Sequence, residues 1–195
     1  MKIAVIDYDA GNVQSVMNAL QRLGVESFLT DDTGLIREAD KVIFPGVGHA
    51  AAAMQKLRNK SLDQVIVSLK QPVLGICLGL QLLCRHSEEG NTGCLGIFDT
   101  AVRRFELEGL KVPQVGWNNI FGYASPLFDT VKENGFVYCV HSYYAEVCSQ
   151  TVATTEYGIP YSAALQKDNF YAVQFHPEKS GSIGEMILQN FLSLV

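Results

Sequence analysis

Residues 73–86 read VLGICLGLQLLCRH, and this stretch decides the fold. The apolar run 73–76 is typical of a short buried strand. The chain then turns at Cys77, and the apolar spacing that follows predicts a helix to about His86. Gly75 and Gly79 flank the cysteine, which gives the form G-x-C-x-G of a sharp strand-to-helix turn. The stretch therefore predicts a strand-helix unit of a sheet that helices cover.

The N-terminal half shows the same alternation of strands and helices. The expected strands are residues 2–6, 25–29 and 41–44, and the expected helices are 13–23 and, in two pieces, 49–69. After a turn at 7–11, Asn12 is a candidate cap for the first helix, which Gly24 ends. Such alternation is typical of a parallel sheet with both faces covered.

The second half is richer in strands. They are expected at residues 101–105, 136–140, 151–155, 163–166 and 171–175, before a final amphipathic helix at 182–194. We therefore expect an α/β fold whose central, mostly parallel sheet has helices on both faces and added antiparallel strands. No repeat or linker divides the chain, so residues 1–195 are expected to form a single domain. Functional sites of such sheets lie outside the carboxyl ends of the strands.

The composition excludes several classes of protein. Hydrophobic residues make up 48% and charged residues 18% of the 195 residues, which is typical of a globular protein. The net charge is −5 and no basic run occurs, so neither nucleic acid nor an anionic membrane is an expected partner. Asp7 comes too early for a signal peptide, and the longest apolar stretch falls short of the roughly 20 residues of a transmembrane helix. We expect a soluble, cytoplasmic protein.

Cys77 is the candidate nucleophile. The five cysteines form no C-x-x-C pair, and neither a metal nor a cofactor is expected. The turn at Cys77 would lift its sulfur out of the sheet and set it at a helix amino terminus. Such a position lowers the pKa of a thiol from ~8.5 into the ~3.5 to 7.5 range. The alternative interpretation is that residues 75–79 are only the buried end of a strand.

His176-Pro177-Glu178 supplies the candidate base. Proline disfavours helical geometry at the preceding residue, so His176 is expected to be extended at the end of its strand. Residues two apart in an extended chain face the same way, so Glu178 is expected to bind one ring nitrogen and leave the other for the thiol. Alone, His-x-Glu is more often a surface turn. Together with the turn at Cys77 it indicates a catalytic pair.

Two further features fit the same site. Residues 45–48, PGVG, follow a strand, and their glycines allow a backbone amide to face a neighbouring site. An oxyanion hole needs such a donor, which is worth roughly 2.7 to 4 kcal/mol, although this pattern alone is usually only a loop. Gln81 lies four residues after Cys77 and so on the same helix face. A buried polar side chain there needs a partner, either a ligand or a loop backbone.

These residues resemble a known family. Residues 75–81 (GICLGLQ) and 174–178 (QFHPE) are similar to the class I, triad-type glutamine amidotransferases, which hydrolyse L-glutamine and pass ammonia to a synthase partner. Within that superfamily, further stretches resemble the glutaminase-subunit family of imidazole glycerol phosphate synthase: 6–8 with 11–12, 45–48, 113–118 and 140–144. Asp9 departs from the pattern, which has glycine there. The resemblance spans nearly the whole chain and implies the three-layer class I glutamine amidotransferase fold.

The resemblance also implies a role for each matching position. Cys77 would be the nucleophile, His176 the general base and then acid, and Glu178 the residue that orients His176. Attack on the side-chain amide of glutamine would release ammonia and leave a glutamyl thioester for hydrolysis. The amides of Val47 and Leu78 would form the oxyanion hole. The positions that hold glutamine would be Gly48, Gln81, Glu89 (to the α-amino group), Ser142 and Tyr143.

The implied partner is a β/α-barrel cyclase in a heterodimer. It joins ammonia to a phosphorylated ribulosyl intermediate and yields imidazole glycerol phosphate and an aminoimidazole carboxamide ribotide in histidine biosynthesis. Asn12, Trp117 and Lys179 correspond to interface positions, and residues 45–48 would be poorly set for catalysis until the partner's ligand binds. Three alternatives stay open: the glutaminase subunit of another synthase, a non-catalytic interaction subunit, and a cysteine peptidase on a similar sheet.

Overall fold

The computed structural model describes residues 1–9 and 13–194. Its centre is a seven-stranded sheet in the order β11-β12-β13-β4-β3-β1-β2. Parallel pairs join β1 (Lys2–Ile6), β2 (Glu26–Thr30), β3 (Lys41–Gly46), β4 (Val73–Cys77) and β13 (Phe170–Val173). β12 (Ile159–Lys167) and β11 (Thr151–Tyr157) extend the sheet with antiparallel pairs. The predicted α/β fold with a mostly parallel central sheet is confirmed.

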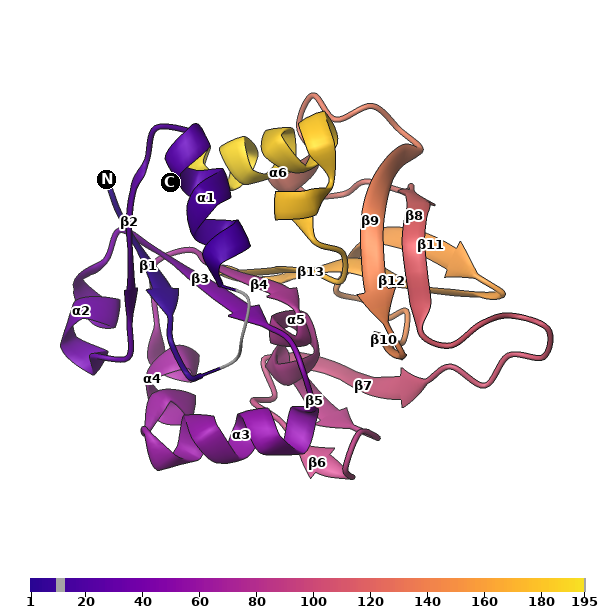
Figure 1. Ribbon diagram of the computed structural model, residues 1–195, viewed down its shortest axis with the longest axis horizontal. Coiled ribbons are helices and arrows are strands. Elements are labelled where there is room, and N and C mark those ends of the chain that lie inside the picture. Colours follow the sequence, from indigo (N-terminus) through magenta and orange to yellow (C-terminus); the bar gives the residue numbers. More distant parts are fainter. Residues whose placement is uncertain (10–12, 195) are drawn as a thin grey trace.

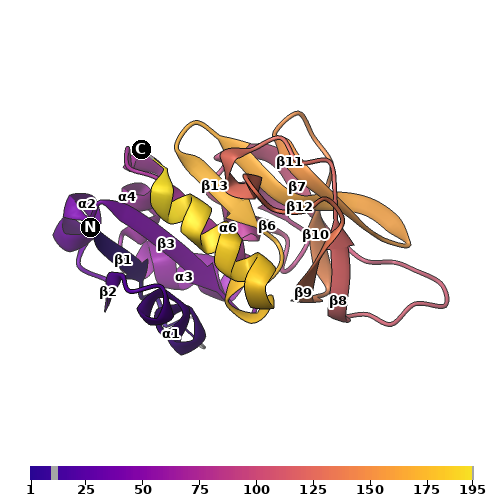
Figure 2. The ribbon, with the colours of Figure 1, turned by 90° about the horizontal axis from the view of Figure 1, so that it is seen from above.

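Helices cover both faces of this sheet (Figure 1). On one face lie α1 (Gln14–Arg22) and α6 (Gly181–Ser193); on the other lie α2 (Thr33–Glu38), α3 (Ala50–Asn59), α4 (Leu62–Ser68) and α5 (Leu78–Leu83). Ile3 and Val5 of β1 are buried in the core under α1 and α6, whereas Ala4 and Ile6 are buried in the opposite core. This alternation is the two-residue period of a strand with two buried faces. Figure 2 shows α6 running across the sheet. Among the described residues, no helix is both long and apolar enough to cross a membrane.

Two smaller sheets surround the carboxyl end of β4. β8 (Gln114–Ile120) and β9 (Gly135–His141) form an antiparallel pair at one end of the molecule, beside β11 and β12 (Figure 1). The other sheet has the order β10-β7-β5-β6, from β5 (Cys84–Ser87), β6 (Thr92–Gly93), β7 (Phe98–Arg104) and β10 (Tyr143–Ala145). Two short 3-10 helices are η1 (Pro126–Phe128) and η2 (Pro177–Lys179). The carboxyl end of β9 lies beside Cys77, because the Val140 carbonyl is 3.8 Å from the Cys77 sulfur.

Some elements differ from those that the sequence predicts. The predicted helix from Cys77 to about His86 is wrong at its end, because α5 ends at Leu83 and the next residues form β5. β5 pairs in parallel with β7, so a tertiary contact overrides the local apolar spacing. Besides β5, the elements that were not expected from the sequence are α2, β6, β8, β10 and the 3-10 helices η1 and η2.

The first loop accommodates the one departure from the family pattern. Asp9 stands where glycine is expected, and its φ of 59° lies in the left-handed region that glycine enters without steric cost. Aspartate also visits this region more readily than most residues. The Asp9 carbonyl accepts a hydrogen bond from Lys56 Nζ at 2.7 Å, and its carboxylate lies 3.4 Å from Lys60 Nζ. The predicted cap Asn12 lies outside the described residues.

Candidate active site

Cys77 occupies the turn between β4 and α5. Its φ of 54° and ψ of −108° put a non-glycine residue in strained backbone geometry, which is the sharp turn that the sequence predicts. Gly46 at the end of β3 lies in register with Cys77, so the segment after Gly46 begins beside the sulfur. α5 is only six residues long, shorter than expected, and Leu78 is its first residue.

The two glycines around Cys77 are needed for space rather than for their φ angles. A Cβ at Gly79 would overlap the Phe44 carbonyl of β3. A Cβ at Gly75 would lie 3.1 Å from backbone atoms of Gly79 and Leu80 and 2.7 Å from the Leu83 side chain. α5 can therefore lie directly against β3 and β4 only because neither position carries a side chain.

His176 and Glu178 form the predicted pair. His176 follows β13 with extended backbone (φ −101°, ψ 94°), as its proline neighbour predicts. The His176 Nδ1 and Glu178 Oε1 atoms are 2.9 Å apart, and the two side chains are only 6% and 4% exposed. The predicted backbone conformation is wrong in one detail, because the chain is not extended from His176 to Glu178. The 3-10 turn η2 begins at Pro177 and folds the carboxylate back onto the ring.

The surroundings of His176 favour its charged form. Burial by itself would lower the pKa of His176, but hydrogen bonds with Cys77 and Glu178, and their negative charges, raise it to about 10. His141, the neighbouring buried histidine, behaves in the opposite way, because burial lowers its pKa to about 4. At neutral pH the site thus combines an imidazolium at His176 with a neutral ring at His141.

Gln81 is tied to the protein by its amide nitrogen. Its Nε2 donates to the Tyr143 carbonyl at 3.0 Å and to Gln174 Oε1 at 3.1 Å. The Tyr143 carbonyl also accepts from His141 Nδ1 at 2.8 Å. Both amide protons of Gln81 are therefore engaged, and its oxygen is the atom left to meet a ligand.

Glu89 joins the pocket to the start of α3. Its Oε2 accepts a hydrogen bond of 2.6 Å from the backbone amide of Ala50, the first residue of that helix. His49, at the cap position, makes no side-chain capping bond. The adjacent Glu88 is exposed and binds Arg103 at 2.8 Å. Of these two neighbouring carboxylates, Glu89 is thus the one that lines the pocket.

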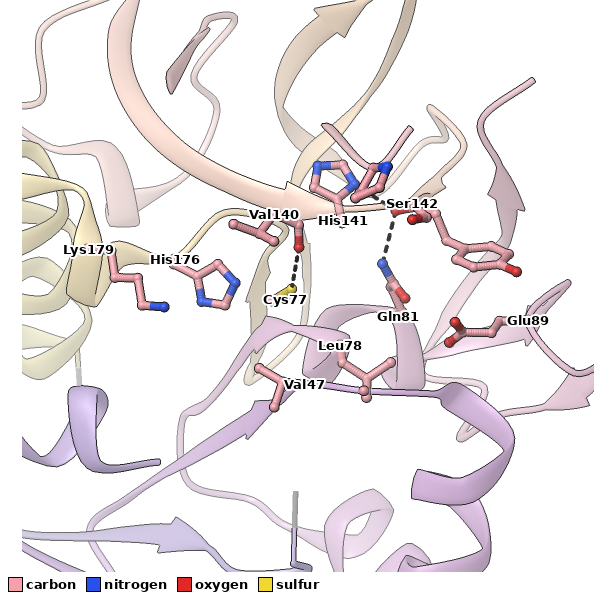
Figure 3. A pocket seen from close by; sticks show the side chains of 13 residues that line it. Val47, Cys77, Leu78, Gln81, Glu89, Val140, His141, Ser142, His176 and Lys179 are labelled. Carbon is pink, nitrogen blue, oxygen red and sulfur yellow. Dashed lines mark hydrogen bonds between the residues drawn. The ribbon is translucent and has the colours of Figure 1, made fainter. Parts of the chain in front are cut away.

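The predicted catalytic, oxyanion and glutamine-binding residues, except Glu178 behind His176, line one cavity of about 310 Å³ (Figure 3). His176 and Lys179 lie at one end, Cys77 lies in the middle, and Gln81 and Glu89 lie toward the other end. The remaining predicted lining residues are Val47, Gly48, Leu78, Ser142 and Tyr143. Lining residues that were not predicted as site residues are Pro113, Val140 and His141, although all three belong to stretches quoted for the family resemblance.

Gln174 is a further functional candidate, which was not predicted as a site residue. It is 1% exposed, and its Nε2 lies 3.8 Å from the Cys77 sulfur. A usable signal was present, because Gln174 lies two positions before His176 and so on the same side of an extended segment.

An exposed apolar patch adjoins the cavity on β8 and β9. Trp117 is 57% exposed and lies opposite Tyr138, with the two ring centres 5.9 Å apart. Val115 pairs with Val140, which lines the cavity, and these two positions share the Trp117 face of the sheet. Phe136, 57% exposed, lies farther along the same face. Of the predicted interface residues, Trp117 lies in this patch and Lys179 lines the cavity, whereas Asn12 lies outside the described residues.

The fold and this cavity define a class of enzyme that sequence comparison identifies. The family described as glutamine amidotransferase class-I matches residues 4–194. The chain is 57% identical to the imidazole glycerol phosphate synthase subunit HisH of Bacteroides thetaiotaomicron, with 100% of both chains covered. It is 44% identical to the subunit HisH of Yersinia pseudotuberculosis, again over 100% of both chains. The chain therefore belongs to the class-I glutamine amidotransferase family and, within it, to the HisH subunits of imidazole glycerol phosphate synthase.

Solved structures support the fold independently. A crystal structure of a glutamine amidotransferase superposes with a TM-score of 0.75 at 16% identity and covers 97% of this chain and 96% of its own. The structure of PurLQS from Thermotoga maritima gives a TM-score of 0.74 at 17% identity, with 98% and 97% covered. At these identities the likeness concerns the fold alone.

Proposed function

We propose that this chain hydrolyses L-glutamine to glutamate and ammonia and delivers the ammonia to a β/α-barrel cyclase subunit of imidazole glycerol phosphate synthase in histidine biosynthesis. The observation that carries the proposal is the convergence of separate segments on one cavity of about 310 Å³. Cys77, His176 and the glutamine-binding candidates come from different elements, yet all line it. An arrangement that served packing alone would not need these polar groups to face a common space.

The proposed reaction proceeds through a thioester. The Cys77 sulfur, held as a thiolate beside protonated His176, attacks the side-chain carbonyl carbon of glutamine. The amides of Val47 and Leu78 stabilise the resulting oxyanion. His176 gives its proton to the leaving nitrogen, the C–N bond breaks, and ammonia departs. His176 then takes a proton from water, whose oxygen attacks the thioester. Release of glutamate regenerates the thiolate and the imidazolium.

The order of the residues along the cavity suits one orientation of glutamine. A substrate amide at Cys77 would place its α-amino group toward Glu89, because these residues lie along the cavity rather than on top of one another (Figure 3). A carboxylate pairs well with an ammonium group. Gly48, Ser142 and Tyr143 would complete the binding site, with the oxygen of Gln81 as an acceptor.

The proposed cyclase interface is the patch on β8 and β9 with the rim of the cavity. Ammonia released into water at neutral pH is protonated and lost as a nucleophile, so the acceptor site must lie directly against this one. Trp117 and Lys179 would contact the cyclase, and Asn12 is proposed for the same interface. Large exposed apolar side chains that adjoin one another are typical of such surfaces.

We further propose that residues 45–48 change conformation when the cyclase binds its own ligand. Val47 and Gly48 line the active-site cavity and also a second cavity of about 120 Å³ beside His49 and Lys56. Gly48 has a φ of 102°, and apart from its chain neighbours no atom of residues 1–9 and 13–194 lies within 4 Å of the position that its Cβ would take. The segment therefore has space to adopt a second arrangement, which a ligand of the complex could favour.

The test is ammonia release from glutamine by the chain alone, with the barrel subunit, and with that subunit and its ligand. We expect the highest rate in the full complex and at least a ~10⁴-fold loss in Cys77→Ala. Glutamine turnover that persists in Cys77→Ala would overturn the assignment of Cys77 as the nucleophile. Equal rates for the free chain and the full complex would overturn the proposed change at 45–48.

Co-purification identifies the partner. A cyclase of barrel fold recovered at a one-to-one ratio supports the proposal, whereas recovery of a chorismate- or purine-using enzyme instead would contradict it.

A further inference from the structure

We propose that the side-chain amide of Gln174 donates a hydrogen bond to the Cys77 sulfur and so stabilises the thiolate, in an orientation that Gln81 fixes. The inference rests on the proposed function, in which Cys77 is the nucleophile. It assigns to Gln174 a role in catalysis, because the amide contacts the reacting atom itself.

The contact is a buried one. Gln174 is 1% exposed, and its Nε2 lies 3.8 Å from Cys77 Sγ, within hydrogen-bonding range for sulfur. The backbone of Gln174 is held in the sheet, since its amide donates to the Ala163 carbonyl at 2.9 Å. The side chain is therefore placed by the sheet and shielded from water, where a hydrogen bond to a charge is strongest.

A chain of hydrogen bonds fixes which end of the Gln174 amide faces the sulfur. The Tyr143 carbonyl can only accept, so the end of Gln81 that contacts it at 3.0 Å must be the NH₂ group. The same NH₂ group lies 3.1 Å from Gln174, which must therefore offer its oxygen there. The NH₂ group of Gln174 is then left to point at Cys77. A backbone carbonyl thus determines the orientation of both amides.

The other groups around the sulfur divide into those that favour the thiolate and those that do not. The Val140 carbonyl, 3.8 Å from Sγ, accepts from a protonated thiol and so favours the neutral form. Charged His176 opposes this effect. Burial raises the pKa of Cys139 to about 12 and that of Tyr8 well above its usual range. Both neighbours are therefore neutral at neutral pH and place no negative charge beside the Cys77 sulfur.

His141, Glu89 and Lys179 line the same cavity. His141 is neutral above its pKa of about 4, so it adds no charge at neutral pH. The Gln174 amide therefore offsets the preference of the Val140 carbonyl for the neutral thiol.

The experiment measures the pKa of Cys77 directly. The rate of Cys77 alkylation by iodoacetamide is followed from about pH 5 to about pH 10, with the modified Cys77 peptide quantified by mass spectrometry. The variants are Gln174→Met, which removes the donor at similar volume, and Gln174→Glu, whose Oε1 still accepts from Gln81 while an acceptor faces the sulfur. The matched control is Gln114→Met, since Gln114 is also a buried glutamine, 4% exposed, and contacts Tyr161 at 2.8 Å.

We expect the midpoint of alkylation to rise by about one pH unit in Gln174→Met and further in Gln174→Glu, with no change in Gln114→Met. Thermal unfolding is recorded for each variant. A Gln174→Met protein that unfolds at lower temperature but keeps the wild-type alkylation midpoint would assign Gln174 to packing only and overturn the inference. That result would leave the proposed function intact. A wild-type midpoint near ~8.5 would overturn the inference too, and the ammonia assay then shows separately whether the proposed function fails.

Discussion

Glu178 contacts His176 through only one of its carboxylate oxygens. Oε1 lies 2.9 Å from Nδ1, whereas Oε2 is buried and has no hydrogen-bond partner among the described residues. A buried carboxylate with a single donor is poorly stabilised by itself. The hydrogen bond and the charge of Glu178 both help to raise the pKa of His176. Removing the charge of Glu178 should therefore lower the pKa of His176.

Glu178→Gln tests this dependence through the pH profile. The pKa of His176 is raised to about 10, so the imidazolium form persists from acid pH until it is lost as the pH rises through that value. Replacing the carboxylate by a neutral amide should lower the pKa of His176 and move the alkaline limb of kcat/KM down by about one to two pH units. We also expect kcat to fall ~10²- to 10⁴-fold.

The measurement for Glu178→Gln is ammonia release across pH in the complex with the cyclase. Glu185→Gln is a suitable control, because Glu185 pairs with Arg22 on the surface at 3.5 Å. An alkaline limb that stays in place in Glu178→Gln would show that the carboxylate does not hold the charge on His176.

The strand-to-helix turn at Cys77 depends on close backbone packing between elements. A side chain at Gly79 would overlap the Phe44 carbonyl, so Gly79→Ala must push α5 away from β3. We expect the free energy of unfolding to fall by about 3 kcal/mol or more, measured by urea denaturation. Gly93→Ala is the matched control, because in the described part of the chain only its own neighbours lie within 4 Å of its Cβ position in β6. Similar losses in both variants would contradict the packing argument.

Glu89 connects substrate binding to the segment that precedes α3. One of its oxygens holds the amide of Ala50 at 2.6 Å, and Val47 and Gly48 lie just before that residue. In the proposed function, the same carboxylate meets the α-amino group of glutamine. The two tasks can be separated, because binding an ammonium needs the charge, whereas holding the helix amide needs only an acceptor.

We expect Glu89→Gln to raise KM for glutamine about tenfold or more with little change in kcat, because the amide oxygen can still accept from Ala50. Glu89→Ala should raise KM and also lower kcat about fivefold, since the start of α3 loses a partner worth about 1 kcal/mol. Adding His49→Asp to Glu89→Ala supplies a local cap at a residue that already has extended backbone (φ −109°, ψ 130°). That double variant should recover kcat but not KM. Steady-state ammonia release measures both, and identical constants in Glu89→Gln and Glu89→Ala would refute the separation.

Elements with their own local signals were predictable. The spacing of apolar residues predicts α6, and the run 73–76 with its glycines predicts β4 and the turn after it. β5 was not predictable in this way, because it exists through its pairing with β7 and no breaker follows Leu83. α2 was missed because its six residues are too few to show a periodic pattern, although Asp32 caps it with bonds of 2.8 and 3.0 Å.

The site residues likewise divide into those with a local sequence signal and those that tertiary contacts place. Cys77 and His176 follow from local geometry, since glycines and a proline constrain the backbone beside them. Gln174 has only its spacing of two residues from His176 as a local signal, and its orientation comes from Gln81, which is distant in sequence. Glu89 matched the family pattern, but its bond to Ala50 depends on how the loop after β5 folds back.

At the scale of the whole molecule, the patch on β8 and β9 and the active-site cavity form one continuous surface. Trp117 and Phe136 are both 57% exposed, and Val140 belongs both to this sheet and to the cavity lining. Lys179 lines the same cavity. A chain that needed only to hydrolyse glutamine would gain nothing from exposing a tryptophan beside its active site. The patch therefore fits a subunit whose product is handed on.

Trp117→Ala tests whether the patch on β8 and β9 binds the cyclase, and Leu35→Ala is the matched control. Leu35 is 48% exposed on α2, at the opposite end of the molecule (Figure 1). Buried interface tryptophans contribute about 2 kcal/mol or more, so Trp117→Ala should weaken binding of the cyclase ~30-fold or more by calorimetry, with the thermal unfolding of the free chain unchanged. Leu35→Ala should bind as the wild type does. In the assembled enzyme, synthesis driven by glutamine should fall in Trp117→Ala, whereas synthesis driven by added ammonia should not, because the cyclase site itself is untouched. Equal binding by the two variants would place the interface elsewhere on the molecule.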